Sequence, residues 1–497
     1  MKPKRLIAFA MALLICLCGL AACATEPETE ETTPDTTVAA VEESTTASLY
    51  DEEGYLLDSL PDSLDFNKTE IWMLYDELVT MPEYFVESEN GELVNDAIWK
   101  RNITVEDRLN CVLKFYGTQG NDTKQTIYCT AAQTDYDSGD NKYALYGAYS
   151  RTIPLLSMKG FLQDLCQTDY FMAENPWWPD SLTNELTIKD KLFMATGDIS
   201  TTVLWMMSTI YYNKVLWTEA ATGYELEDLV NSGDWTLDKF IEIIKDFYRD
   251  DGDGIVNDND IFGYTSFNAC VDAFLNYAGV VSIDKDENGN LKLSDDFLGE
   301  KTDNIVSKLG AVCTTKTFHY SSDESVERQV FYNGHALFIC DGSYVVTSAQ
   351  SNNGIEFEYG ILPGPKYDKE QPKYVTNMRY PYEMYAINSG STYVKEASAV
   401  LEAQGSAGYR YVTPAIFEVT MKARYASDNE SSKMYDLIRE GVVFDIGRIY
   451  NYSINNFYPN FRNTCFSGGR GWIKSISGIN KAVKLQLENV MKLYDAD

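Results

Sequence analysis

The stretch Asp250–Asp260 combines carboxylate and amide side chains with glycines, a composition that suits a hard cation. Calcium loops place oxygen ligands at alternate positions, a glycine at the sharp turn and a carboxylate at the closing position. We take Gly254 as the turning glycine. The ligand positions then fall on Asp251, Asp253 and Asp260. These residues predict a calcium ion that stabilises the loop and takes no part in catalysis.

One residue of this loop departs from the pattern. The first ligand position falls on Arg249, a cation where an acidic ligand is expected. Two interpretations stay open at this point. Either Asp250 replaces the missing ligand through a shifted backbone, or the metal is lost and the loop is an acidic surface turn.

The first residues have the order of a secretory signal. Met1–Arg5 is basic, Leu6–Ala22 is apolar and uncharged, and small residues precede Cys23. The order Leu-Ala-Ala-Cys resembles the lipobox of bacterial lipoproteins. That resemblance implies a signal peptide over residues 1–22, cleavage before Cys23 and a diacylglycerol on its thiol. The alternative is an ordinary signal peptide in which the cysteine has no role.

The residues after the predicted signal are rich in Thr and Glu. Segment 23–55 has no Lys or Arg and few large apolar residues. Such a composition cannot bury enough apolar surface to offset its ordering entropy. We therefore expect a disordered tether that holds a globular body at the outer face of the cell membrane. The folded body should begin near residue 56.

Charge and composition exclude several classes of protein. The chain carries a formal net charge of -34, so it lacks the positive surface that nucleic acids require. The same charge disfavours flat binding to an anionic membrane. Hydrophobic residues make up 44% and aromatic residues 13%, enough for sizeable cores. The cysteines after residue 23 are scattered without a CxxC pair, which favours packing as small apolar residues and leaves room for one disulfide.

Strands and helices alternate in the first part of the body. Ile71–Tyr75 and Cys111–Tyr116 are short apolar runs typical of buried strands. Between them, residues 95–110 have a helical stripe. Tyr143–Tyr146 is a further predicted strand, and Thr152–Leu156 is helix-like. This order predicts an α/β fold with a parallel sheet covered by helices.

Further along, Thr236 is a predicted helix N-cap, with an acidic residue in the first turn and an apolar stripe behind it. This helix start belongs to a set of motifs that appear in one order along the chain. They are Tyr211–Lys214, Asp234–Phe240, Tyr332–Phe338 and Tyr359–Pro363. In this order, behind a lipobox and a tether, they resemble the family 1 extracellular solute-binding lipoproteins of ABC importers, the group that includes sugar-binding receptors. The resemblance spans about residues 65–494.

The resemblance implies a type II periplasmic-binding-protein-like fold, with two α/β lobes hinged by crossing strands. Lobe 1 would comprise residues 64–200 and 364–413, and lobe 2 residues 201–363 and 414–497. The crossings would lie near Gly197–Thr202, Leu362–Pro363 and Val412–Thr413. A ligand would lie in the cleft, and the lobes would close on it.

Residues at the crossings and at the sheet ends should face this cleft. Aromatic faces cover the apolar patches of sugars, while carboxylates, amides and Arg bind hydroxyl groups. The candidate ligand-binding residues chosen by position are Tyr146, Tyr149, Asp198, Trp205, Ser343, Tyr344, Arg379, Tyr380, Tyr382, Arg470 and Trp472. For each of them, packing is the alternative role, and for Arg470 a structural ion pair. Pro176–Trp178 is interpreted as a hydrophobic anchor.

The family resemblance implies a monomeric, lipid-anchored receptor that captures a small solute, preferably a carbohydrate, and delivers it to membrane permease subunits. No catalytic residue or required cofactor is expected. The sequence has no HExxH, GxSxG or phosphate-loop motif. Its many Asp and Glu residues keep a surface-anchored glycoside hydrolase as one alternative. An adhesion or scaffold protein is the other.

Overall fold

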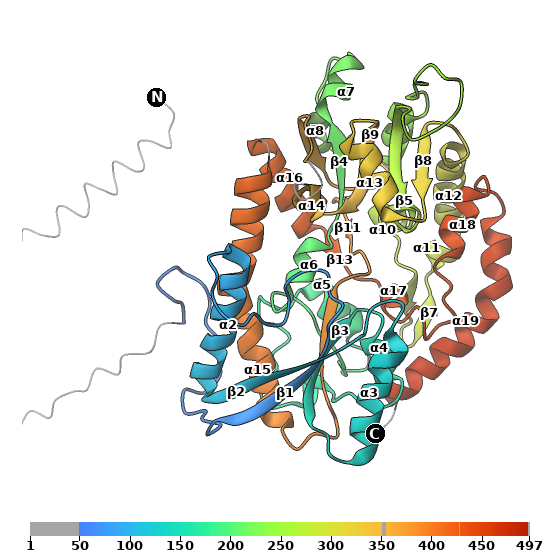
Figure 1. Ribbon diagram of the computed structural model, residues 1–497. Helices are drawn as coiled ribbons and strands as arrows, with labels where there is room; N and C mark the ends of the chain where they lie inside the picture. The colour runs from blue at the N-terminus through green and yellow to red at the C-terminus, as the bar shows by residue number, and fades with distance from the viewer. Residues whose placement is uncertain (1–48, 350–353, 427, 496–497) are drawn as a thin grey trace, which may run out of the picture. The chain divides into compact units, whose positions relative to one another are not determined.

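The computed structural model describes residues 49–349, 354–426 and 428–495, and Leu49–Asp497 forms one compact unit (Figure 1). The predicted signal peptide, the predicted lipid attachment at Cys23 and residues 23–48 of the predicted tether lie outside the described residues. Residues 49–55 belong to the body. Tyr50 pairs with Leu56, and the ring of Tyr55 packs edge-on against Tyr409 at 5.5 Å. The tether therefore ends earlier than its composition predicts, because Tyr55 finds an aromatic partner far along the chain.

The first lobe is built on a four-stranded sheet of order β12-β3-β1-β2. Its strands are β1 (Thr69–Asp76), β2 (Cys111–Thr118), β3 (Tyr143–Tyr149) and β12 (Glu383–Ile387). β1 pairs in parallel with β2 and β3, as the strand-helix alternation predicts, whereas β12 pairs antiparallel to β3. β12 comes from a distant part of the sequence and adds an antiparallel edge that the local pattern does not show. Helices of this lobe are α2 (Leu93–Leu109), α3 (Gln125–Ser138), α4 (Ile153–Ser157), α5 (Asp180–Leu186) and α15 (Val394–Ala407).

The second lobe is built on a five-stranded sheet of order β10-β4-β9-β5-β8. Its strands are β4 (Ser208–Asn213), β5 (Phe262–Phe267), β8 (Phe318–Ser321), β9 (Ala336–Gly342) and β10 (Tyr359–Leu362). β5 is parallel to β8 and β9, while β4 is antiparallel to both of its neighbours. A small hairpin, β6 (Ile283–Lys285) and β7 (Leu291–Leu293), is attached to this lobe.

The helices of the second lobe are α7 (Lys214–Glu219), α8 (Leu226–Ser232), α9 (Leu237–Ile244), α10 (Ala273–Tyr277), α11 (Asp295–Leu298), α12 (Glu300–Cys313), α13 (Glu324–Tyr332), α14 (Val345–Ala349), α16 (Asn429–Glu440), α18 (Asn460–Phe466) and α19 (Trp472–Asp495). Thr236 caps α9 by accepting a hydrogen bond from the Lys239 amide at 3.3 Å, which confirms the predicted helix start. The indole of Trp235 donates to the Pro363 carbonyl at 2.8 Å. This bond joins the segments of two of the sequence motifs.

The chain crosses between the lobes in three places. The first crossing follows Ala195, which pairs with β12, and contains α6 (Thr201–Trp205) before β4 begins. The second crossing runs from β11 (Thr376–Asn377) to β12. It lies later than the predicted Leu362–Pro363, because Lys366 hydrogen-bonds to Trp235 and keeps this segment on the second lobe.

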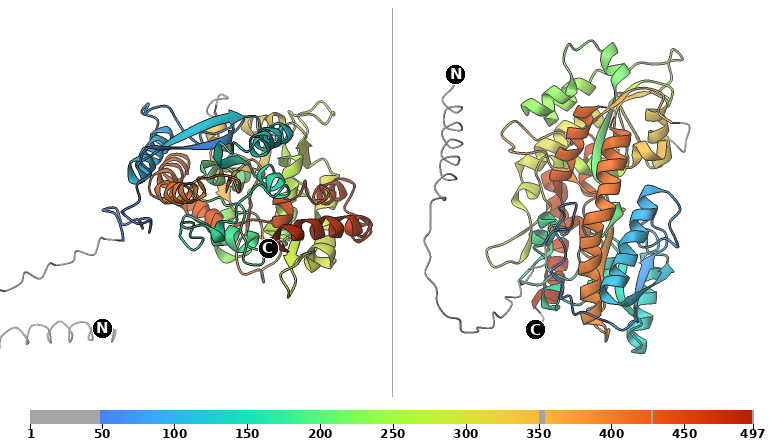
Figure 2. Two further views of the ribbon diagram at one scale, coloured as in Figure 1. Left: turned by 90° about the horizontal axis from the view of Figure 1, so that it is seen from below. Right: turned by 90° about the vertical axis from the view of Figure 1, so that its left-hand side faces the viewer.

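The third crossing is helical and not a strand. α15 continues through Val412 as π-helical turns over Gly408–Val412 and Pro414–Tyr425. Proline lacks the N–H that an α-helix interior requires, and a wider turn tolerates that loss. Figure 2 shows this helical column extending alongside both lobes, from α15 toward α16.

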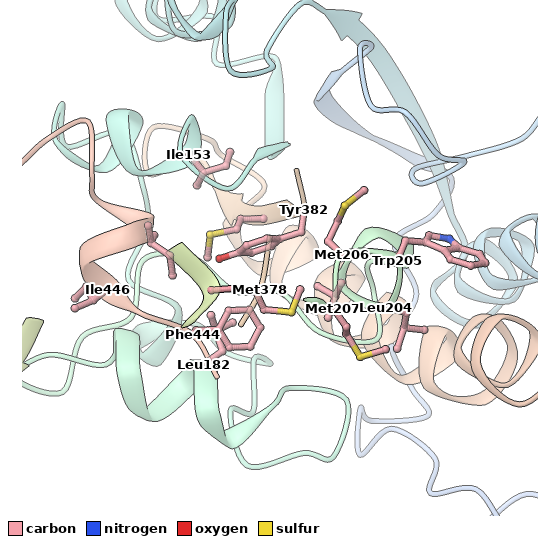
Figure 3. Close-up of a cluster of buried hydrophobic side chains, with 14 of the residues drawn as sticks. Ile153, Leu182, Leu204, Trp205, Met206, Met207, Met378, Tyr382, Phe444 and Ile446 are labelled. Atoms are coloured by element: carbon pink, nitrogen blue, oxygen red, sulfur yellow. The ribbon is translucent and has the colours of Figure 1, made fainter. Parts of the chain in front are cut away.

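An apolar hinge core lies where the crossings meet (Figure 3). Met207 pairs with Met378, and the Arg379 amide donates to the Met206 carbonyl at 2.9 Å, so the first two crossings run side by side. Phe444 and Tyr382 pack edge-on at 5.7 Å in the same cluster. β13 (Val442–Val443), which pairs with β11, and α17 (Ile446–Ile449) bring the C-terminal part of the chain to this core.

Trp177 and Trp178 are a structural anchor, as predicted, and each is almost completely buried. Their indole N–H groups donate to the carboxylate of Glu402 at 3.2 and 3.0 Å. Among the described residues the cysteines after residue 23 are free thiols, and Cys166 alone of them is exposed. The described part of the chain contains no helix that is both long enough and apolar enough to span a membrane.

Candidate functional site: a cleft between the two lobes

A cavity of about 490 Å³ lies between the two sheets. It collects the carboxyl ends of parallel strands from both lobes: Asp76 ends β1, Tyr149 ends β3, and Phe267 ends β5. Crevices at the carboxyl ends of α/β sheets are the usual ligand sites of such folds. The second crossing and the segment around α17 complete the wall. Their contributions are Asn377, Arg379, Tyr380, Pro381, Glu383, Arg448, Asn451, Tyr452, Asn456, Pro459 and Arg462.

Tyr380 lies between two guanidinium groups in this wall. The guanidinium carbons of Arg151 and Arg448 lie 3.9 and 4.0 Å from the centre of its ring. Cations are attracted to an aromatic face at such distances. Because its ring already stacks against two arginines, Tyr380 holds these cations in place and does not offer an open face to a ligand.

Arg151 is further fixed by the first lobe. It forms an ion pair with Asp122 and donates to the Tyr149 hydroxyl at 2.8 Å. Asp122 also accepts from the hydroxyl of Tyr452, which belongs to the segment after α17. Asp122 therefore links the loop after β2 to the C-terminal part of the cavity wall.

Arg379 belongs to a second charged cluster. It forms ion pairs with Asp341 at the end of β9 and with Glu324 at the start of α13, the latter at 2.9 Å. Arg328 contacts the same two carboxylates. Burial opposes the charge of Asp341, but the two arginines hold its pKa below the ordinary value. This cluster fastens the second crossing to the second lobe.

Two further carboxyl groups lie deep in the wall. Asp76 accepts from the backbone amides of Leu78 and Gly120 at 3.0 and 2.7 Å, and burial raises its pKa. Glu383 accepts from the Tyr84 hydroxyl, and burial raises the pKa of Glu383 well above the usual range. Burial therefore disfavours the charged form of Glu383.

Of the candidates chosen from sequence, Tyr149, Arg379 and Tyr380 line the cavity. The others lie elsewhere. Tyr146 is fully buried inside the first lobe. Asp198 accepts from the Thr413 hydroxyl at 2.6 Å and faces Arg439 at 3.6 Å, which places it against the third crossing.

Trp205 and Tyr382 belong to the hinge core, where both are nearly completely buried (Figure 3). The hydroxyl of Ser343 donates to the Leu204 carbonyl behind the same core. Tyr344 contacts Arg328 and Arg379 through its hydroxyl and stands behind the charged cluster of the second crossing. These four side chains support the hinge and the cleft wall and do not face the cavity.

Trp472 and Arg470 require a correction too. Trp472 is fully buried and donates its indole N–H to the Phe297 carbonyl at 2.9 Å. Arg470 is exposed on the outer side of the second lobe, beside α12. The glycines of this loop serve backbone packing: a Cβ on Gly310 would lie 2.2 Å from the Gly469 nitrogen. The glycine-rich loop is therefore a contact between α12 and α18, not a ligand loop.

Sequence reasoning missed the main cavity residues Asp122, Arg151, Arg448, Tyr452 and Arg462. Arg151 could have been found, because it comes two residues after Tyr149 at the end of a predicted strand. Of the other four, Asp122 and Tyr452 lie in turns, and Arg448 and Arg462 lie in the short helices α17 and α18. The position of these segments depends on contacts that neither periodicity nor spacing shows.

The acidic loop keeps part of its predicted form. Oxygen atoms of Asp250, Asp251 and Asp253 lie within 4.8 Å of one another, and all three residues are exposed. Asp260 does not join them, because its carboxylate accepts from the Tyr248 hydroxyl at 2.7 Å and the Asp251 amide at 3.0 Å. Arg249 turns away and pairs with Glu219. Asp250 Oδ1 also accepts from the Gly252 and Gly254 amides at 2.9 and 3.0 Å, so the arrangement is compatible with both interpretations. Calcium binding itself stays a prediction.

We expect 1 mM calcium to raise the melting temperature of the protein measurably above that in EGTA. Asp253→Asn should reduce this increase, because it removes one carboxylate charge from the group of three. Differential scanning fluorimetry measures the shift, with Asp62→Asn, an exposed site on the first lobe, as the control. Equal melting temperatures in calcium and EGTA would identify the loop as an acidic turn.

Comparison with known proteins supports the two-lobed fold. No family model and no curated protein matches the chain. Several solved structures resemble it over most of its length. A family 1 extracellular solute-binding protein from Bifidobacterium longum subsp. infantis has a TM-score of 0.55 at 13% identity, covering 85% of this chain and 99% of the other.

A cyclic α-maltosyl-1,6-maltose binding protein from Arthrobacter globiformis has a TM-score of 0.54 at 13% identity, covering 85% of this chain and 100% of the other. A cyclo/maltodextrin-binding protein complexed with maltotetraose has a TM-score of 0.54 at 12% identity, with coverages of 85% and 97%. The chain thus has the two-lobed α/β fold of extracellular solute-binding proteins. At these identities the likeness establishes the fold alone.

Proposed function

We propose that the protein is a solute-binding receptor of an ABC importer that captures a carbohydrate in the cavity between its lobes. The observation that carries this proposal is the cavity itself, which both lobes and the second crossing line with hydrogen-bonding and aromatic side chains. A hinge that can open and close, with a ligand buried between lobes, is the working principle of such receptors. The similar structures that bind maltodextrins support carbohydrate as the ligand class.

The state of the cleft carboxylates argues against a glycoside hydrolase. Such an enzyme needs an acid and a base or nucleophile that can reach the glycosidic bond. Asp76 is held by backbone amides, Asp122 by Arg151, and Glu324 by Arg328 and Arg379. Carboxylates held in this way fix the backbone and the arginines of the cleft wall in position. These contacts, together with the likeness to binding proteins, support a receptor that binds its ligand without converting it.

The lipid anchor on Cys23 and delivery to a permease are part of the same proposal. The order of basic, apolar and small residues before Cys23 supports the anchor, and a tether of several tens of residues would leave the receptor free to reach a permease. The receptor would act as a monomer at the outer face of the cell membrane.

A thermal-shift screen with neutral and acidic oligosaccharides tests the binding function. We expect at least one sugar to raise the melting temperature. Tyr452→Ala should weaken that sugar's affinity by about tenfold, because it removes an aromatic ring from the cavity wall. Tyr393→Ala, at an exposed tyrosine before α15, is the matched control and should leave the affinity unchanged. Turnover of a glycan, or a Tyr452 variant that binds like the parent, would contradict the proposal.

A further inference from the structure

The cleft has unused hydrogen-bond donors, and they belong to arginines. Arg448 is 6% exposed and donates through Nη2 to the Met378 carbonyl at 3.2 Å. Its Nη1 is buried without a hydrogen-bond partner among the described residues. A buried donor without a partner destabilises the protein, so a ligand that accepts from it offsets that cost.

Two more guanidinium groups contribute in the same way. Arg462 uses Nη1 for Asp272, and within the described chain its Nη2 and Nε donate to no side chain or carbonyl. Arg151 uses Nε and Nη2 for Tyr149 and Asp122, which leaves Nη1. Each guanidinium carries five N–H donors and no acceptor.

The acceptors of the cleft are in the opposite state. The carboxylates of Asp122 and Glu324 are shared between two or more donors of the protein, and Asp76 is held by two backbone amides. Glu383 already accepts from the Tyr84 hydroxyl. A neutral sugar presents hydroxyl groups that donate as readily as they accept, whereas these carboxylates already accept from donors of the protein. The acceptors left to such hydroxyls are uncharged oxygens such as Asn377 Oδ1.

The guanidinium of Arg448 keeps its charge in this setting. Burial opposes the charge, but the Tyr380 and Tyr458 rings and the carboxylates of Asp272 and Asp445 raise the pKa of Arg448 above its ordinary value. Asp272 pairs with Arg462, and Asp445 accepts from the Ser282 hydroxyl and caps α17. These two carboxylates keep Arg448 ionised but do not occupy its Nη1.

We propose that the carbohydrate is an acidic one, and that an anionic group on it, the carboxylate of a uronic acid or a sulfate ester, accepts from Arg448, Arg462 and Arg151. The inference rests on the proposed receptor function and adds its ligand class. Guanidinium forks match planar carboxylates and sulfate-type oxygens, and such charge-assisted bonds are about twice as strong as neutral ones. The arginines provide this attraction locally, although the chain as a whole carries a net charge of -34.

Isothermal titration calorimetry with three trisaccharides tests the inference. The probes are a galacturonate trisaccharide, its carboxyl-reduced neutral counterpart, and a galactose trisaccharide carrying sulfate esters. We expect the carboxylated or the sulfated probe to bind at least tenfold more tightly than the neutral one, and the stronger of the two identifies the anionic group. The affinity of the tighter-binding anionic probe should fall as the salt concentration is raised from 50 to 500 mM.

Arg462→Gln should weaken the acidic ligand at least tenfold and leave any binding of the neutral probe unchanged. Arg448→Gln should do the same, and circular dichroism checks the native fold of both variants, because Arg462 pairs with the buried Asp272. Arg151→Gln, whose partner Asp122 is 48% exposed, serves if either variant fails to fold. Arg249→Gln, an exposed arginine outside the cleft, is the control.

Two results would overturn the inference. If the neutral probe binds as tightly as the acidic ones, the receptor function stands and the acidic ligand class is wrong. If none of the three produces heat or a melting shift, the acidic class is wrong as well, and the wider sugar screen then decides the receptor function separately.

Discussion

Replacing Arg101 with methionine is expected to lower the free energy of unfolding by about 3–5 kcal/mol. Arg101 lies in α2 and is 1% exposed. Its guanidinium donates to three backbone carbonyls, those of Ile199 at 2.7 Å, Glu83 at 2.9 Å and Tyr84 at 2.7 Å. Methionine fills a similar volume but donates nothing, so these buried acceptors lose their partners.

The position of Ile199 links this stability effect to the hinge, because Ile199 belongs to the first crossing. Urea denaturation of the parent and of Arg101→Met measures the change in unfolding free energy. Arg249→Met is the matched control: its exposed ion pair with Glu219 should contribute less than about 1 kcal/mol. A loss below about 1 kcal/mol in Arg101→Met would show that the three carbonyls find other donors.

The sequence predicts local structure well where one element decides it. The apolar runs at 71–75 and 111–116 lie in β1 and β2, and Thr236 caps α9. The sequence does not predict the pairing of strands that lie far apart in the chain. β12 joins the first sheet from residues 383–387, and no local pattern indicates that it lies antiparallel beside β3.

The cleft was harder to predict than the fold. Position relative to the crossings correctly brought Tyr149, Arg379 and Tyr380 to the cavity. It failed for aromatic residues such as Trp205 and Trp472, because a large ring is buried in a core as readily as it faces a ligand. Arg101 is the opposite case. A charged residue in a helix is expected at the surface, but Arg101 is buried because three backbone carbonyls from other segments accept its hydrogen bonds.

The second prediction with a large expected effect concerns Glu327 in α13, whose replacement should increase the free energy of unfolding. Its side chain is fully buried, and neither carboxyl oxygen has a hydrogen-bond partner among the described residues. Burial, together with the charges of Asp341 and Glu324, raises the pKa of Glu327 to about 8, although Arg328 acts against this shift. The unfolded chain ionises the same group near 4.5.

The pH dependence follows from this difference. Between pH 4.5 and 8 the unfolded state has lost the Glu327 proton while the folded state keeps it, so rising pH favours unfolding. The contribution of Glu327 to the free energy of unfolding is therefore most favourable below pH 4.5, and it declines as the pH rises toward 8.

Glu327→Gln should remove that decline, because glutamine has nearly the same shape and does not ionise. We expect the variant to differ from the parent by less than about 1 kcal/mol at pH 5 and to be about 2–4 kcal/mol more stable at pH 8. Urea denaturation at both pH values measures the difference, and Glu440→Gln, at an exposed site that ends α16, should show no such pH-dependent gain. The variant and the parent could instead differ in unfolding free energy by the same amount at pH 5 and pH 8. Glu327 would then ionise in the folded protein as it does in the unfolded chain, with a compensating charge in α13 or its neighbours.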